Sequence, residues 1–594
     1  MRFARSWPPF FGLALFACQF AVLDICLRAS RFGHDWKAWL AAASSVGAWM
    51  VLGLAARNAW LRAIVSVVAA SVLVTELEYY RYYHAFVEDD AIACARSMWL
   101  DVAPVLAKAL PHVAVVVLGV GAIEYCLLVR APRPKNGLLW RAATVAIGLV
   151  ASTMSKPWGP PELRSLWSLR VFLREREAAA NVQISLPVLE SRFARLPNVL
   201  FILNESIRAS DYSVQTLESF LPEWRATVPS RIEFRRMHSL ASYTSISVNA
   251  LLSGVMPLGK RFDVAQTPLI FDYLRATSSN GKRVRTLYWS AQGTAAFERA
   301  DPRSMADSVA FFDDVLGRKV ASIAELVESG ADSKLAEFAR RRLPTQSRPL
   351  FLLAHLTDTH APYHVDDSTA PYRPYSHTVS WAGLDALHNA YKNAILAQDR
   401  SVLELVRAFV QTVGTEPYVI LFTSDHGEAF GEHQAIHHGQ NLYAEQIHVP
   451  AWVVTANGAV TFEQEHWLRT HANEPTTHLD FLPTLLDLYG ISNNYGIAGP
   501  KSKLLGRSLL GPFIGPSAIL PMTNCTLVFP CPLQNYGLIR DGVALEAQPW
   551  DSQWRCADLA TQQAFLPLNQ QPCAELVAAS KSLYEKLPNG APNR

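Results

Sequence analysis

Carboxylates and a histidine follow two short apolar runs, and together they could bind a divalent metal ion. Glu205 comes directly after Asn204 at the end of one run, and Asp425 and His426 follow another run that ends near Phe422. Two carboxylates and one imidazole suit Zn²⁺ or Mn²⁺ and leave one coordination position for a nucleophile or a substrate oxygen. The residue types therefore predict a catalytic metal site.

A third segment of the same kind follows the apolar run at 350–353. Residues 355–363 read His-Leu-Thr-Asp-Thr-His-Ala-Pro-Tyr and include His355 and His360. One polar strand end alone is more often a helix cap or a turn, because Asp and Asn favour those positions. Three such segments in one chain favour a shared site.

A hydroxyl-rich segment, residues 242–254, supplies candidates for a nucleophile. A bound metal lowers the pKa of a nearby hydroxyl, so that its alkoxide can attack an electrophile. Four side chains in this segment are candidates, and their spacing alone does not choose among them: Ser242, Thr244, Ser245 and Ser247.

The elements that position these residues are predicted from short apolar runs that alternate with helix-like segments. Such alternation is typical of an α/β domain with a mainly parallel central sheet. In open sheets of this kind, functional residues gather at the carboxyl ends of the strands. The expected strands cover residues 199–203, 284–289, 350–353, 419–422 and 451–454.

The remaining apolar residues are concentrated before about residue 155, which predicts an all-α membrane domain. The 594-residue chain is 50% hydrophobic, and its mean hydropathy is +0.10. Its net charge of +3 without a long basic run argues against a dedicated nucleic-acid binder. About five transmembrane helices are expected, at residues 9–27, 38–56, 63–74, 113–129 and 137–154. The third is the weakest candidate, because Arg62 and Glu76 flank it closely.

Charge asymmetry between the connecting segments predicts the orientation in the membrane. With the N-terminus inside, the cytoplasmic segments carry basic residues and no acidic ones, as the positive-inside rule expects. The first stretch could also be a cleaved signal peptide, but no small-residue cleavage site follows Leu27. Everything after Met154 is then extracytoplasmic. The basic residues of the cytoplasmic segments are Arg2, Arg5, Arg57, Arg62, Arg130, Arg133, Lys135 and Arg141.

The expected domain organisation follows from these patterns. A transmembrane domain covers residues 1–155, an amphipathic interfacial linker covers 156–197, and a catalytic α/β domain covers 198–594.

Clustered cysteines in an oxidising compartment predict two disulfides, and a four-cysteine zinc site is less expected because short C-x-x-C pairs are missing. The pairing stays open among Cys525, Cys531, Cys556 and Cys573.

The segments together resemble the alkaline phosphatase/sulfatase superfamily, in particular its membrane-anchored phosphoethanolamine transferases. Residues 204–213 are similar to the first metal motif of these transferases, which implies metal ligation by Glu205. The Asp-His-Gly-Glu run at 425–428 resembles the superfamily motif and implies ligation by Asp425 and His426. Thr244 falls where these enzymes place their nucleophilic threonine and metal ligand, and the Ala-Leu-Leu-Ser-Gly run that follows supports this register.

The same resemblance gives roles to further histidines. His360 and His438 match residues that hold the transferred phosphate or a second zinc ion. Four other histidines are weaker candidates, namely His355, His433, His437 and His448. The resemblance also implies the fold, an α-helical membrane part followed by a periplasmic α/β sulfatase-like domain in the inner membrane of a bacterium.

The expected activity is a zinc-dependent transfer of phosphoethanolamine from phosphatidylethanolamine to an envelope glycan or lipid, such as lipid A or a periplasmic glucan. A phosphothreonine at Thr244 would be the intermediate, with one or two Zn²⁺ ions or with Mn²⁺. The alternatives are a phosphoglycerol transferase of the lipoteichoic acid synthase or glucan type, a membrane-bound phosphodiesterase or hydrolase, and a non-catalytic glycolipid binder. Formylglycine sulfatase chemistry is not expected, because x-Pro-x-Arg does not follow Thr244.

Overall fold

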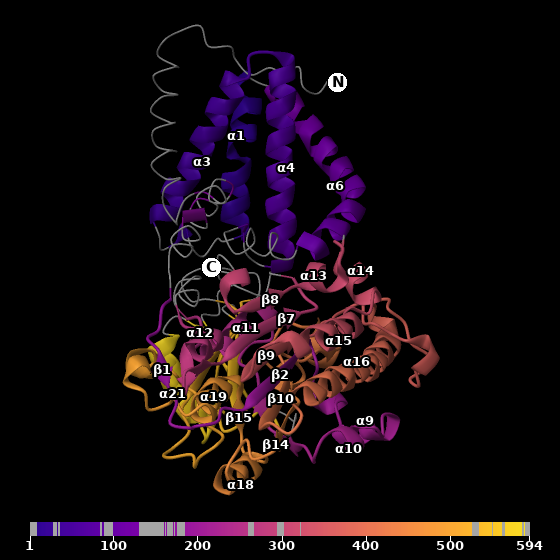
Figure 1. Ribbon diagram of the computed structural model, residues 1–594. Helices are drawn as coiled ribbons and strands as arrows, with labels where there is room; N and C mark the ends of the chain where they lie inside the picture. The colour runs from indigo at the N-terminus through magenta and orange to yellow at the C-terminus, as the bar shows by residue number, and fades with distance from the viewer. Residues whose placement is uncertain are drawn as a thin grey trace.

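The computed structural model has an upper group of apolar helices and a lower α/β domain (Figure 1). The structure describes residues 9–27, 32–33, 36–83, 86–87, 99–129, 160, 162, 170, 173–174, 184–258, 267–293, 302–320, 322–525, 534–548, 551–560, 565–584 and 587–588.

Within the described residues, four helices are long and apolar enough to cross a membrane. They correspond to the first four expected spans, and the third forms a helix of 25 residues despite its flanking charges. The fifth expected span, residues 137–154, lies outside the described residues. The helices are α1 (Pro9–Leu27), α3 (Trp36–Ala55), α4 (Ala59–Tyr83) and α6 (Trp99–Leu128).

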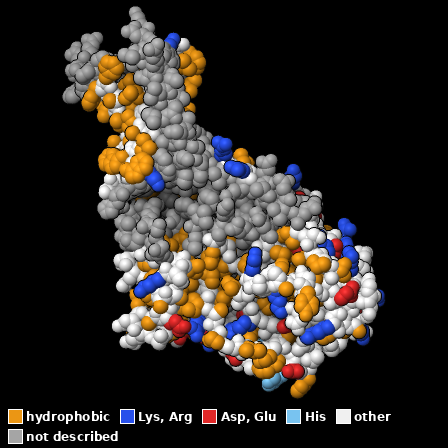
Figure 2. All heavy atoms as spheres, turned by 90° about the vertical axis from the view of Figure 1, so that its left-hand side faces the viewer, with side chains coloured by type: hydrophobic (Ala, Val, Ile, Leu, Met, Phe, Trp, Pro, Cys, Tyr) orange, Lys and Arg blue, Asp and Glu red, His pale blue; other side chains and the backbone are white. Residues whose placement is uncertain are grey.

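Apolar side chains point outward from these helices, as a lipid environment requires. Trp36 is 69% exposed and Val115 is 70% exposed. Figure 2 shows hydrophobic side chains over the described part of the upper helices and charged side chains spread over the α/β domain. Helices α1 and α6 approach so closely at Gly12 that a β-carbon there would lie 2.3 Å from the carbonyl oxygen of Leu127.

One residue of the expected linker contacts the membrane helices. Glu162 is buried, and its Oε1 accepts hydrogen bonds from Ser45 Oγ and, at 3.2 Å, from Trp49 Nε1. Most of the linker lies outside the described residues. The expected domain boundaries at 155 and 197 therefore stay predictions.

The α/β domain is built on a mixed sheet of seven strands. Five neighbouring strands run parallel, whereas β14 pairs antiparallel with β10 and β3 pairs antiparallel with β14. The expectation of a mainly parallel sheet is confirmed, and the last expected strand differs only in direction. The order is β3 (Ile232–Glu233), β14 (Ala451–Ala456), β10 (Tyr418–Ser424), β2 (Asn198–Asn204), β9 (Leu350–His355), β7 (Arg285–Ser290) and β8 (Ser308–Ala310).

Helices cover both faces of this sheet. Alternate residues of a strand point to opposite faces, so each central strand contacts helices on both sides. Phe201 and Leu203 of β2 belong to the core cluster with α11 (Thr244–Ser253), α12 (Ile270–Ala276) and α19 (Phe481–Leu488). Leu200 and Ile202 belong to the cluster with α15 (Ala331–Arg342) and α16 (Leu384–Val413). The central strands are therefore buried on both faces, which explains their continuous apolar runs.

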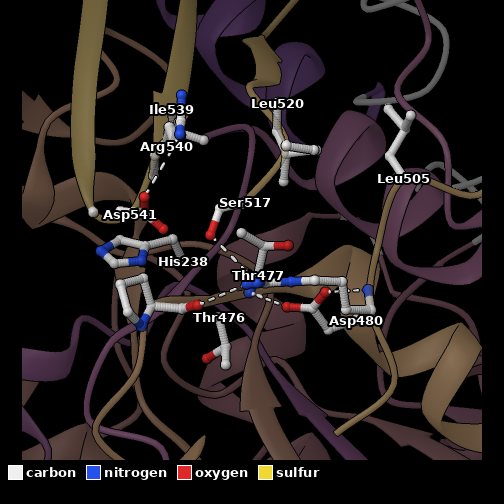
Figure 3. Close-up of a pocket in the computed structure, with 14 residues that line it drawn as sticks. His238, Thr476, Thr477, Asp480, Leu505, Ser517, Leu520, Ile539, Arg540 and Asp541 are labelled. Atoms are coloured by element: carbon white, nitrogen blue, oxygen red, sulfur yellow. Dashed lines mark hydrogen bonds and ion pairs between the residues drawn. The ribbon is translucent and has the colours of Figure 1, made fainter. Parts of the chain in front are cut away.

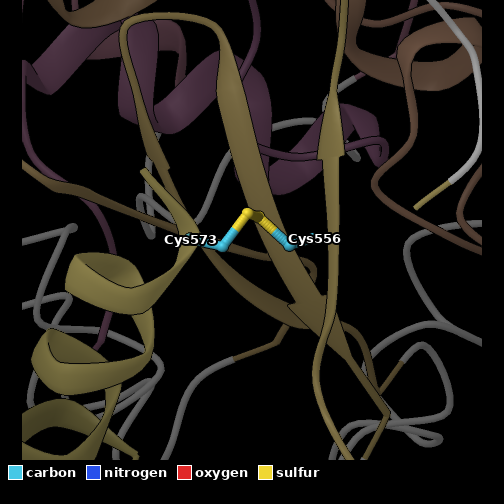
Figure 4. The surroundings of a disulfide bond; sticks show 2 residues. All are labelled: Cys556 and Cys573. Atoms are coloured by element: carbon cyan, nitrogen blue, oxygen red, sulfur yellow. A yellow bond between two sulfur atoms is a disulfide. The ribbon is translucent and has the colours of Figure 1, made fainter. Parts of the chain in front are cut away.

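An antiparallel sheet of four strands near the C-terminus carries a disulfide between Cys556 and Cys573. Helix α21 (Cys573–Leu583) is joined to this sheet by the bond between Cys556 and Cys573 (Figure 4). Cys525 is also disulfide-bonded, and Cys531 lies outside the described residues. The strands are β16 (Leu520–Thr523), β17 (Tyr536–Arg540), β18 (Val543–Ala547) and β19 (Arg555–Asp558).

Candidate metal centre

Adjacent strand ends bring together the residues predicted to bind metal. Strands β2 and β10 are parallel neighbours, and Asn204 is paired with Ser424. The next residues, Glu205 and Asp425, therefore leave the sheet side by side. Ligand atoms of Glu205, Asp425 and His426 lie within 4.8 Å of one another, and all three residues are fully buried.

The two carboxylate oxygens of Asp425 have different environments. Oδ1 accepts hydrogen bonds from the backbone amides of Ser206 (3.0 Å) and His426 (2.7 Å). Oδ2 is buried and has no hydrogen-bond partner among the described residues. Since a buried carboxylate oxygen without a partner is unfavourable, this atom fits a cation ligand.

The orientation of His426 also suits a metal ligand. Its Nδ1 lies 2.9 Å from the carbonyl oxygen of Gly427 and donates to it. This contact leaves Nε2 facing Glu205 Oε1 (3.4 Å) and Asp425 Oδ2 (3.3 Å). A backbone carbonyl that fixes the tautomer in this way is common around metal-bound histidines.

The electrostatics of this group are set by two buried carboxylates beside one imidazole. Burial lowers the pKa of His426, but the charges of Asp425 and Glu205 outweigh it and raise the pKa to about 10. Burial and the charge of the neighbouring Glu205 raise the pKa of Asp425 well above its usual range. The two buried carboxylates therefore favour a compensating positive charge, which a proton or a divalent cation can supply.

Gly427 lets the motif pack closely against the chain behind it. A β-carbon at this position would lie 2.3 Å from the carbonyl oxygen of Glu445 and 3.0 Å from Cβ of Arg208. Any larger residue would push these groups away, and with them the backbone that carries Asp425 and His426.

Thr244 is the hydroxyl that faces the ligand group. It is the first residue of α11, and its Oγ1 lies 3.1 Å from Glu205 Oε1 and 3.0 Å from His426 Nε2. Two other candidates have backbone partners instead, because Ser242 donates to Asn441 O and Ser247 donates to Asp425 O. Helix α11, which begins at Thr244, is capped at its other end by Gly254, whose φ of 70° favours glycine.

His360 and His438 form a second possible ligand group with Glu205. Ligand atoms of these three residues also lie within 4.8 Å of one another. Nδ1 of His360 is 2.7 Å from the carbonyl oxygen of Ala361, and Nδ1 of His438 is 3.1 Å from Glu428 Oε2. Each ring therefore has Nε2 left for a ligand, and Glu205 is shared between the two groups.

Glu428 is a site residue to which the sequence analysis gave no role. This buried carboxylate contacts His437 (2.8 Å), His438 (3.1 Å) and the Tyr363 hydroxyl (3.1 Å). Burial raises its pKa, but the two histidines outweigh this and hold the pKa well below its usual range. Its place at the end of the Asp-His-Gly-Glu run was the available signal.

Gln292 is a second missed residue. Its Nε2 donates to Glu205 Oε2 and, at 3.1 Å, to the carbonyl oxygen of Leu356. It orients the shared carboxylate from a loop after β7. Nothing in the local sequence distinguishes it from other polar loop residues.

The weaker histidine candidates differ in their placement. His437 shares Glu428, whereas His355 is buried beside the Tyr288 hydroxyl (2.9 Å) and burial lowers its pKa to about 4. His433 contacts Glu445 (2.9 Å), and His448 contacts the carbonyl oxygen of Arg235 (2.9 Å). None of these four is in the two ligand groups found among the described residues.

A separate pocket is lined in part by β16 and β17 of the C-terminal sheet (Figure 3). Arg507 spans part of it, with its backbone amide 2.6 Å from Asp480 Oδ1 and its Nη1 3.3 Å from Ser517 Oγ. Its lining includes His238, Thr476 and Thr477 but no residue of the two ligand groups. The metal centre and this pocket are therefore distinct.

Comparison with known proteins agrees with this geometry. Residues 197–491 match the sulfatase family, and this range holds all six predicted site residues. This chain is a sulfatase-family protein. It belongs to the alkaline phosphatase superfamily and is distantly related to phosphoethanolamine transferases.

The curated relatives of this sulfatase-family chain include two from Escherichia coli. It is 29% identical to phosphatidylethanolamine transferase Mcr-2 over 153 residues and 28% identical to Mcr-1 over 155 residues. Each alignment covers 24% of this chain and 27% of the relative. The chain thus aligns with only about a quarter of the length of these relatives.

A solved structure shows the same fold over most of the chain. The integral membrane lipooligosaccharide phosphoethanolamine transferase A (EptA) from Neisseria meningitidis superposes with a TM-score of 0.51 at 15% identity. The match covers 84% of this chain and 98% of that protein. The expected combination of membrane helices and a sulfatase-like α/β domain is therefore confirmed.

Proposed function

We propose that this protein transfers phosphoethanolamine from phosphatidylethanolamine to an envelope glycan or lipid through a phosphothreonine at Thr244. The observation that carries the proposal is the position of Thr244 Oγ1, within 3.1 Å of both Glu205 and His426. The distant relationship to phosphoethanolamine transferases supports the choice of donor.

Glu205, Asp425 and His426 would hold a zinc ion, with Thr244 at the remaining position. When bound, the ion supplies positive charge that lowers the pKa of the Thr244 hydroxyl and counters charge on the phosphoryl oxygens. The unpartnered Asp425 Oδ2 and the oriented Nε2 of His426 are the features of this chain that fit such an ion.

In the first half-reaction, the Thr244 hydroxyl gives up its proton, and its hydrogen bond to Glu205 Oε1 at 3.1 Å marks the neighbouring carboxylate that can accept it. The alkoxide then attacks the phosphorus of the lipid. A bond forms between Oγ1 and phosphorus, and the bond between phosphorus and the glycerol oxygen breaks. Diacylglycerol leaves after its oxygen takes a proton, for which His360 and His438 are the candidate donors.

In the second half-reaction, a hydroxyl or phosphate oxygen of the acceptor attacks the phosphorus of the phosphothreonine. A bond forms between that oxygen and phosphorus, the bond between phosphorus and Oγ1 breaks, and Oγ1 takes up a proton that the acceptor or the solvent supplies, which restores Thr244. The N-terminus of α11, where Thr244 lies, favours the negative phosphoryl group through its backbone amides. His360 and His438 would stabilise the same oxygens directly or, with Glu205, through a second zinc ion.

The membrane helices give the reaction its setting. A phospholipid donor keeps its acyl chains in the bilayer, so anchoring the site near the membrane raises its effective concentration. We propose that the α/β domain is periplasmic, in line with the charge asymmetry of the membrane segments. The acceptor would be a lipid, such as lipid A, or a glycan of the same compartment.

Intact-protein mass spectrometry tests the proposal. The purified full-length protein in detergent is incubated with phosphatidylethanolamine or, separately, with phosphatidylglycerol. We expect an adduct of the phosphoethanolamine mass that is absent in Thr244→Ala and present in Ser245→Ala, the neighbouring hydroxyl. A phosphoglycerol adduct would assign the protein to the phosphoglycerol transferases, and zinc-loaded protein without any adduct would indicate a hydrolase or a binder.

A further inference from the structure

We infer that Asp332, Gln398 and Thr359 form a positioning relay that fixes Glu205 and His360 relative to each other. None of the three belongs to the two ligand groups, and all three are buried. The inference rests on the metal centre of the proposed function. It assigns a role to polar side chains behind the site that the transfer reaction itself does not use.

Gln398 of α16 is the centre of the relay. Its Nε2 lies 2.8 Å from Asp332 Oδ2 and 3.1 Å from Thr359 Oγ1. An amide nitrogen carries two hydrogens, and both are used here. Because a carboxylate only accepts, Asp332 fixes which end of the Gln398 amide faces the loop that carries Thr359.

Thr359 passes this constraint to the metal ligands. Its Oγ1 accepts from Gln398 and donates to the backbone carbonyl oxygen of Glu205 at 2.5 Å. Thr359 is also bonded through its peptide to His360. One side chain therefore contacts the backbone of the shared ligand and directly precedes a ligand of the second group.

Asp332, the second residue of α15, fixes the start of the same loop. Its Oδ1 accepts from the Thr357 amide (2.8 Å), and its Oδ2 accepts from the Asp358 amide (3.0 Å). The amide of His360 in turn donates to the carbonyl oxygen of Thr357 (2.8 Å). The turn that delivers His360 is therefore held from both ends, at Asp332 and at Thr359.

This arrangement matters because Glu205 serves both ligand groups. Two nearby ligand sets that share a carboxylate work only if the loop with His360 stays in register with the end of β2. Residues that orient ligands from behind contribute about 10- to 100-fold to metal affinity in other proteins. A similar contribution is expected from this relay, although it does not touch the substrate.

The test uses Co²⁺ as the probe, titrated into the full-length protein in detergent and followed by visible absorption. Thr359→Val removes the hydroxyl at nearly constant volume, and Thr359→Ser keeps it. We expect Thr359→Val to weaken Co²⁺ binding at least about tenfold and to change the absorption spectrum. Thr359→Ser should restore both to within about twofold of the wild type, since the hydroxyl is the group that acts.

Two further variants separate positioning from general stability. Gln398→Met retains length and volume but donates no hydrogen bond, so it should change the spectrum as Thr359→Val does. Asp399→Asn is the matched control, because Asp399 is the next residue on α16, is also buried, and contacts Trp224 Nε1 (2.8 Å) instead. It should lower the melting temperature and leave the spectrum unchanged.

Three outcomes would overturn the inference. Thr359→Val could match the wild type in Co²⁺ affinity and spectrum while losing only stability, or Thr359→Ser could fail to rescue it. The wild type could also bind no Co²⁺. The titration uses no lipid, so a wild type that binds Co²⁺ but forms no phosphothreonine would contradict the proposed function and leave the relay supported.

Discussion

Thr244 Oγ1 lies 3.0 Å from Nε2 of His426, a residue 182 positions later in the chain. The contact exists because α11 begins beside the carboxyl end of β10. A hydroxyl at a helix N-terminus, facing an imidazole and a carboxylate that fit a metal, combines the features of an activated nucleophile.

Removing the Thr244 hydroxyl should abolish transfer and leave the fold intact. In Thr244→Ala we expect the rate of phosphoethanolamine transfer to fall more than about 1000-fold, because the covalent route is lost. Zinc binding should fall only slightly, since Glu205, Asp425 and His426 remain. A transfer assay with a fluorescent phosphatidylethanolamine and zinc analysis on the same sample measure both. A variant with near-normal transfer would exclude Thr244 as the nucleophile.

Zinc binding should release protons at neutral pH. The charges of Asp425 and Glu205 raise the pKa of His426, and burial with the charge of Glu205 raises the pKa of Asp425, so protons held by these two ligands must leave when zinc binds. The expected sign is an affinity that rises with pH between about 6 and 9. Titration calorimetry at pH 7 in buffers of different ionisation enthalpy measures the number of protons released. A value of zero, or an affinity that falls with pH, would contradict the arrangement.

Glu428→Gln should weaken the ligand group that contains His438. Glu428 holds both His437 and His438, and an uncharged amide no longer supports their Nδ1 hydrogens in the same way. We expect metal affinity to drop by about 10- to 100-fold. A competition titration with a chromogenic chelator measures this loss.

Glu432→Gln provides the control for this prediction. Glu432 lies four residues further on, is 39% exposed at its side chain, and pairs with Arg208 at 2.7 Å. Its replacement should change metal affinity by less than about twofold, because Glu432 contacts Arg208 and belongs to neither ligand group. Equal losses in the two variants would mean that Glu428 acts through general charge and not through His438.

Much of the candidate centre could be predicted from the sequence because its proposed ligands Glu205 and Asp425 directly follow strands. Apolar runs mark the strands, and parallel neighbours deliver Glu205 and Asp425 to the same edge of the sheet. Gln292 was missed since its role arises from a contact with Glu205, 87 residues earlier in the chain, whereas Glu428 was missed although it ends the Asp-His-Gly-Glu run. The direction of β14 was equally hidden, because an apolar run has the same composition whichever way the strand runs.

The disulfide should stabilise the α/β domain without affecting the metal centre. Cys556 and Cys573 are 17 residues apart, and a closed loop of about this length corresponds to about 3 kcal/mol of unfolding free energy. The double variant Cys556→Ser with Cys573→Ser should lose a stability of this order, measured by denaturant unfolding under oxidising conditions. Cys126→Ser, which replaces an exposed free thiol, should lose none. Zinc affinity should match the wild type in both variants, because none of the three replaced cysteines belongs to a ligand group. A loss of zinc affinity in the double variant would show that the C-terminal sheet supports the metal centre.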